Sequence, residues 1–199
     1  HGEIDWVAAL HPEAANYTDV YYEHHLMGKV PTVMAHCIHL SDVEMDRMAE
    51  TQTMVSHCPY SNVNLSSGIA PIRKLFERKI PIGLGSDISG GHIVSMAKVL
   101  TEAIGLSKMK WVEVDQTYAP LTLSEAFYMA TKGGGKFFGK VGSFEKGCEL
   151  DALVIDDTTL FDPNERSLEE RLERWLYVGD DRHIVERYVA GKVTPEPTN

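Results

Sequence analysis

Three short apolar segments, each followed by a helical pattern, restrict the fold of this chain more than any other feature. The segments cover residues 32–36, 53–57 and 80–84, and helical patterns follow at about 41–49, 69–79 and 94–107. Strands that are apolar on both faces and separated by helices form a parallel sheet with helical crossovers. The pattern therefore predicts an α/β fold.

A titratable residue stands at the end of each predicted strand. His36 and His57 close the first two strands, and Asp87 follows the third. Because the carboxyl ends of neighbouring parallel strands meet at one rim, the three side chains are expected to converge. Imidazole and carboxylate groups can ligate a divalent metal, orient a water molecule and move its proton. Asp87 alone is equally explained as a helix cap or turn residue, so the predicted site depends on all three.

The remaining histidines and cysteines are expected to be structural. His24 and His25, near the end of a helix predicted at 18–27, suit the surface. Hydrogen-bonded structural roles are expected for His39, His92 and His183, and small buried packing roles for Cys37, Cys58 and Cys148. Three widely spaced cysteines without a C-x-x-C pair argue against a disulfide framework or a structural zinc knuckle.

The segment HCPYSN, residues 57–62, allows two interpretations. Its proline, serine and asparagine favour a rigid turn in which Ser61 and Asn62 satisfy backbone groups. The alternative is that these side chains contact a substrate. The segment is expected to be a loop that leads to the helix at 69–79.

Charge and hydropathy exclude several kinds of partner. The formal net charge is −10 at pH 7, with an isoelectric point near 5.3, which opposes binding to a nucleic-acid backbone or an anionic membrane. The sequence has no apolar run of bilayer-spanning length and no secretory signal pattern at its start, so a cytoplasmic location is expected.

The periodicity changes after Gly139. Residues 124–139 predict one helix that starts at Ser124, a break at the glycines 133–135 and a short second helix. Alternating patterns at 148–156 and 184–193 then predict short strands, with a charged helix at about 167–175 between them. A small β-rich region is therefore expected beside the α/β part.

Four phrases together resemble the second half of a metal-dependent amidohydrolase. They are AHCIHLS at 35–41, SHCPYSN at 56–62, GLGSD at 83–87 and RWLYVGDDRHIVERYVAGK at 174–192. Within that superfamily they are most similar to the guanine deaminase family, and the resemblance extends over essentially the whole chain.

The resemblance implies the C-terminal part of a TIM-like (β/α)8 barrel of the amidohydrolase type. Residues 1–139 would be its second half with extra C-terminal helices, and residues 140–199 part of a β-sandwich completed by residues further upstream. It also implies one divalent metal ion, with zinc as first choice and iron as second. Asp87 would ligate the metal and accept a proton from the attacking water, and His36 would contact the purine and steady the tetrahedral intermediate. Both residues would thus be catalytic and substrate-binding, whereas His57 would be structural.

Two motifs of the family are missing from this sequence. It contains no H-x-H pair and no H-[IL]-S-E phrase, which in the family carry three metal ligands and the general-acid glutamate. The chain is therefore expected to begin inside a larger fold, with those groups upstream of His1.

The activity implied by the resemblance is hydrolytic deamination of guanine to xanthine and ammonia by a metal-bound hydroxide, in a homodimer. One alternative is another deaminase of the superfamily, acting on an adenosine-like, cytosine or triazine substrate. A second is a non-catalytic half-barrel that serves as a binding or assembly module. Unpaired strand edges in a free half-barrel argue against the second alternative.

Overall fold

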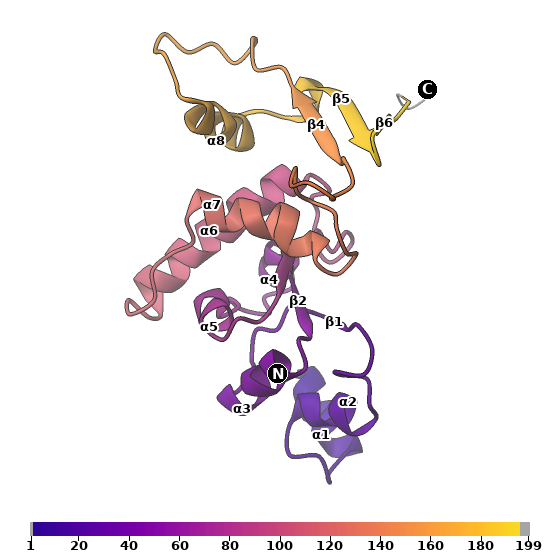
Figure 1. The fold of residues 1–199 in the computed structure, drawn as a ribbon. Helices are drawn as coiled ribbons and strands as arrows, with labels where there is room; N and C mark the ends of the chain where they lie inside the picture. Colours follow the sequence, from indigo (N-terminus) through magenta and orange to yellow (C-terminus); the bar gives the residue numbers. More distant parts are fainter. Residues whose placement is uncertain (1, 196–199) are drawn as a thin grey trace.

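The computed structural model describes residues 2–195, which contain two small sheets. The parallel sheet has the order β1-β2-β3 and consists of Val33–Ala35, Met54–His57 and Ile82–Leu84. The antiparallel sheet has the order β4-β5-β6 and consists of Ala152–Ile155, Ile184–Val189 and Lys192–Val193. Figure 1 shows the antiparallel sheet at one end of the molecule and the parallel sheet near its middle. In the described part β2 is central, so β1 and β3 are edge strands.

Helices make up most of the remaining structure. They are α1 (Gly2–Leu10), α2 (Tyr17–Glu23), α3 (Asp42–Glu50), α4 (Pro59–Asn64), α5 (Ile72–Glu77), α6 (Met96–Glu113), α7 (Leu123–Tyr128) and α8 (Leu168–Val178). A π-helical turn, Met129–Gly133, continues α7, and a 3-10 turn, Asp181–His183, precedes β5. Among residues 2–195 no helix has both the length and the apolar character needed to cross a membrane.

The predicted α/β organisation is confirmed. Each of the three predicted strands is present, all are parallel, and helical segments connect them in sequence. Residues 2–195 contain no closed barrel, since the parallel sheet has three strands. The barrel, the β-sandwich and the division at residue 139 remain predictions.

The expected loop after His57 is wrong, because α4 forms there. Pro59 stands in the first turn of α4, where its fixed φ suits a helix and its missing N–H is not needed. The next helix is correspondingly shorter than predicted and begins at Ile72, directly after Pro71. The sequence pattern missed α4 because its turn-forming residues also suit a short helix start.

The expected break at the glycines after α7 is also wrong. The chain continues from α7 into the π-helical turn, and Thr122, not Ser124, caps the helix by accepting a hydrogen bond from the backbone of Glu125. A Cβ atom on Gly133 would lie 2.6 Å from the carbonyl oxygen of Ile82. The glycines are therefore there for close approach to β3, not to end the helix.

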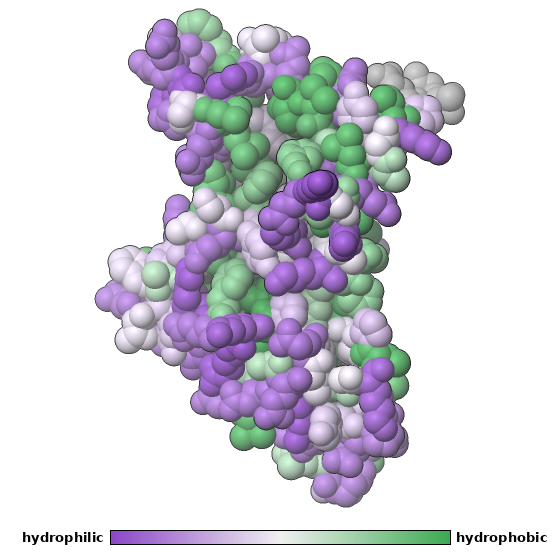
Figure 2. All heavy atoms as spheres, in the orientation of Figure 1, coloured by the Kyte–Doolittle hydropathy of each residue, from purple (hydrophilic) through white to green (hydrophobic). Residues whose placement is uncertain are grey.

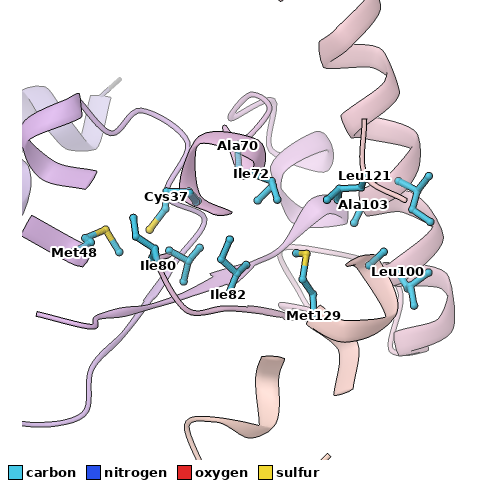
Figure 3. Close-up of a cluster of buried hydrophobic side chains, with 14 of the residues drawn as sticks. Cys37, Met48, Ala70, Ile72, Ile80, Ile82, Leu100, Ala103, Leu121 and Met129 are labelled. Atoms are coloured by element: carbon cyan, nitrogen blue, oxygen red, sulfur yellow. The ribbon is translucent and has the colours of Figure 1, made fainter. Parts of the chain in front are cut away.

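A buried apolar cluster fixes β3 against the helices. Ile80 and Ile82, from the β3 segment, lie in one cluster with Ile72 of α5, Leu100 of α6 and Met129 of the π-helical turn (Figure 3). Full burial of one such side chain contributes about 1.5 to 3 kcal/mol. The strand that leads to Asp87 is therefore held firmly on its helix-facing side.

Apolar side chains also line an open cavity that lies between the parallel sheet and the antiparallel sheet. Its volume is about 1160 Å³, and its lining includes Met54, Gly83, Tyr128, Trp175 and Tyr188. Figure 2 shows apolar residues gathered in the upper half of the molecule, near α8 and the antiparallel sheet, while the lower part around α1 to α3 is mostly hydrophilic.

An ion pair between α5 and α7 gives a testable pH dependence. Arg73 donates two hydrogen bonds to Glu125, of 2.6 and 2.9 Å, and these lower the pKa of the Glu125 carboxyl from 4.5 to about 2. The pair therefore stabilises the fold above pH 4.5, and its contribution is lost as the pH falls from 4.5 through 2. Because Glu125 is about one-third exposed, we expect Glu125→Gln to cost about 1 to 2 kcal/mol at neutral pH.

Denaturant unfolding of the wild type and Glu125→Gln at neutral pH and near pH 3 measures this difference. The free-energy gap between the two proteins should shrink at the lower pH. An unchanged gap would mean that the Arg73 pair is not its source.

Candidate functional site

Two strand ends of the parallel sheet bring His36 and Asp87 together. His36 directly follows β1, and Asp87 follows β3 after Gly85 and Ser86. Nε2 of His36 lies 3.8 Å from Oδ2 of Asp87, and the two side chains are 40% and 37% exposed. The pair is therefore accessible from solvent at the rim of the sheet.

Both residues leave their strands in a left-handed backbone conformation. The φ angles are +66° at His36 and +45° at Asp87, in a region where non-glycine residues carry a cost of about 1 kcal/mol or more. The His36 N–H donates to the Ser56 carbonyl at 2.9 Å, and the Asp87 carbonyl accepts from the Gly91 N–H at 2.6 Å. These contacts hold the two reversals of chain direction in place.

The loop after Asp87 folds back over its own carboxylate and packs on α4. A Cβ atom on Gly90 would lie 2.6 Å from Oδ2 of Asp87 and 2.7 Å from Oγ of Ser61, so this position has no room for a side chain. Asn64 of α4 donates a hydrogen bond of 2.8 Å to the Gly90 carbonyl. The helix thus supports the loop that carries Asp87.

His57 does not join this pair. Its side chain is 1% exposed and borders a cavity of about 170 Å³ between α5 and α6. Burial, with a smaller contribution from nearby His36, lowers the pKa of His57 from 6.5 to about 4, so its imidazole is neutral. The expected convergence of all three strand-end residues is therefore wrong for His57.

Cys58 takes the place that had been assigned to His57. Its Sγ atom, one imidazole nitrogen of His36 and one carboxylate oxygen of Asp87 all lie within 4.8 Å of one another. Cys58 is buried, which raises the pKa of its thiol. Strand alternation accounts for this position, because it places residue 58 on the same side as Ser56 and on the opposite side from His57. The Sγ atom of Cys58 lies 3.7 Å from Oγ of Ser56.

This donor set fits a divalent cation. Imidazole, thiolate and carboxylate are the usual ligand types of zinc, and a tetrahedral site takes four ligands. His36, Cys58 and Asp87 offer up to three candidate donor atoms, all at one rim of one sheet.

The other histidines and cysteines largely have the expected structural positions. His24 and His25 are exposed, and Cys37 and Cys58 are buried. His39 lies 2.9 Å from the Ser67 carbonyl, and His183 is buried beside Asp180. His92 differs from the expected hydrogen-bonded role, since it is exposed and packs its ring edge-on against Tyr60. Cys148 differs from the expectation, since it is only partly buried.

Comparison with known proteins shows the family of this chain. The model of the amidohydrolase family matches residues 1–194. The chain belongs to the amidohydrolase family. This amidohydrolase is 40% identical over 196 residues to a guanine deaminase of Dictyostelium discoideum, covering 95% of the chain and 43% of that protein.

Two solved structures extend the comparison. A guanine deaminase from C. acetobutylicum with guanine bound in its active site superposes with a TM-score of 0.93 and 50% identity, over 96% of this chain and 46% of that one. An adenosine deaminase from Xanthomonas campestris with bound zinc has a TM-score of 0.67 and 26% identity, over 81% of this chain and 36% of that one. The chain thus spans about half the length of the relatives it matches.

Proposed function

We propose that this amidohydrolase is the C-terminal portion of a guanine deaminase. The reaction is hydrolytic replacement of the exocyclic amino group of guanine by oxygen, which gives xanthine and ammonia. The observation that carries the proposal is the match to the guanine-bound structure, at 50% identity over 96% of the chain. The proximity of His36 and Asp87 at one rim supports it.

The metal of this reaction would be held on the present chain by Asp87, with zinc as the proposed ion. Such an ion lowers the pKa of the water it binds and so supplies a nucleophile near neutral pH. Within the chain, Oδ2 of Asp87 can accept the proton that the water loses and pass it toward the departing amino group. His36, 3.8 Å away, can contact the purine through Nε2, and once that nitrogen has also taken up a proton the resulting imidazolium can stabilise the negative charge that develops on the purine.

The remaining ligands and the general-acid glutamate are proposed to come from a part of the protein outside this chain. In the same proposal, residues 1–139 belong to a (β/α)8 barrel, residues 140–199 to a β-sandwich, and the whole enzyme forms a homodimer. Size-exclusion chromatography with light scattering on the full-length protein would test the dimer.

Substrate comparison tests the proposed activity. Ammonia release by the full-length metal-loaded protein should be measured with guanine, adenosine, cytosine and an amino-triazine. We expect kcat/KM for guanine to exceed the others by about 100-fold or more, because a site that hydrogen-bonds one polar pattern strongly rejects others. Preference for another of these amines would show that the protein is a different deaminase of the same superfamily. If the fully metal-loaded protein turned over none of them, the protein would have a non-catalytic role.

A further inference from the structure

Asn62 on α4 contacts the side of His36 that faces away from Asp87. Its Oδ1 atom lies 2.9 Å from Nδ1 of His36, across 26 positions of sequence. Asn62 is 1% exposed, so water does not compete for this bond. The side chain therefore acts neither as a turn residue nor as an exposed substrate contact, the two interpretations that the sequence had left open.

The hydrogen bond decides which imidazole nitrogen carries the proton. An amide oxygen can only accept, so the nitrogen that faces it must be N–H. In a neutral imidazole the other nitrogen then has a free lone pair. For His36 that other nitrogen is Nε2, the atom that faces Asp87 at 3.8 Å.

The backbone of Asn62 is held by hydrogen bonds at both its N–H and its carbonyl. Its backbone N–H donates to the Cys58 carbonyl at 3.0 Å, and its carbonyl accepts from the Ser67 N–H at 2.8 Å. On the same helix, Asn64 holds the loop after Asp87 through the Gly90 carbonyl. One short helix thus connects the two strand ends from which His36 and Asp87 project.

We propose that Asn62 is a positioning residue that holds His36 as the Nδ1–H tautomer, with Nε2 turned toward Asp87. The tautomer follows from the placement of Oδ1 of Asn62 against Nδ1 of His36, and its catalytic meaning rests on the proposed deaminase function. The opposite amide orientation would have Nδ2 of Asn62 donating to His36, and would make Nε2 the protonated nitrogen. The two arrangements differ in a measurable way.

The test uses the full-length protein with 15N-labelled histidine and long-range proton–nitrogen correlation spectra, which distinguish the two tautomers. Loss of its signals in His36→Asn assigns the residue. In the wild type we expect His36 to carry its proton on Nδ1. In Asn62→Ala the proton should move mainly to Nε2, whereas Asn62→Asp, which keeps an acceptor, should retain it on Nδ1.

Kinetics give a second readout. Asn62→Ala should lower kcat for guanine by about 10- to 100-fold, as for other residues that orient a reacting group. The amount of bound metal and the KM for guanine should change little. Val63→Ala is the matched control, because Val63 lies on the same helix but is 49% exposed. It should change neither the spectra nor kcat.

Two results would overturn the proposal. One is a wild-type His36 protonated on Nε2, and the other is an Asn62→Ala protein with an unchanged tautomer. If Asn62→Ala does not fold, the wild type and Asn62→Asp still decide, since both keep the polar side chain. If guanine is not turned over, the deaminase proposal fails while the spectra still report on Asn62.

Discussion

Replacing Asp87 with asparagine in the full-length protein is expected to lower guanine turnover by about 1,000-fold or more and to release most of the bound metal. The amide has nearly the shape of the carboxylate, so the loop that packs over it is preserved. The change removes the negative charge that a divalent cation requires and the oxygen that can take up a proton. Both losses act on the same step, which is why the expected effect is the largest in the molecule.

Metal content by elemental analysis and ammonia release with guanine measure the two effects separately. Asp46→Asn is the matched control, because Asp46 is an exposed carboxylate on α3 that pairs with Arg78. Its loss should leave both quantities unchanged, since exposed ion pairs contribute little. An Asp87→Asn protein with full metal and full turnover would remove Asp87 from the mechanism.

Replacing His36 with asparagine is expected to lower kcat by about 100- to 1,000-fold, the range seen when one group that stabilises transition-state charge is removed. The shorter amide can still donate toward Asn62 from a position near that of Nδ1, but nothing replaces Nε2 beside Asp87. The change therefore removes the reacting end of the side chain and keeps its support. Bound metal should remain.

The same two assays apply, with His25→Asn as control. His25 is exposed and has a φ of +59°, a conformation that asparagine adopts easily. If His36→Asn loses metal as completely as Asp87→Asn, His36 is itself a ligand, as its place in the cluster with Cys58 allows.

The proximity of His36 and Asp87 could be predicted because it follows from topology. Residues at the carboxyl ends of parallel strands in one sheet share a rim, and only β2 separates the strands that His36 and Asp87 follow. The strands themselves were recognisable because they are short, apolar and separated by helices. The start of α3 was recognisable for a local reason, because its capping box joins Ser41 to Glu44, only three residues further on.

Cys58 and Asn62 could not be assigned from the sequence for the opposite reason. Which of His57 and Cys58 faces the rim depends on where strand alternation ends and α4 begins, and a shift of one residue in that boundary exchanges them. The bond from Asn62 to His36 joins segments that are far apart in sequence. Barrel closure and the β-sandwich stay predictions because only three parallel strands lie in the described residues, whereas a whole barrel takes about 250 residues.

The order of the parallel sheet determines the direction from which this site can be extended. His36 and Asp87 follow the two outer strands, and Cys58 follows the central one. A further strand that paired with β3 would have its carboxyl end about 4.8 Å to the side of the end of β3, and the same holds for β1. Donor groups at the ends of such strands would lie beside His36 or Asp87, on the outer side of each. They would not have to displace Cys58, which follows the strand that lies between those preceding His36 and Asp87.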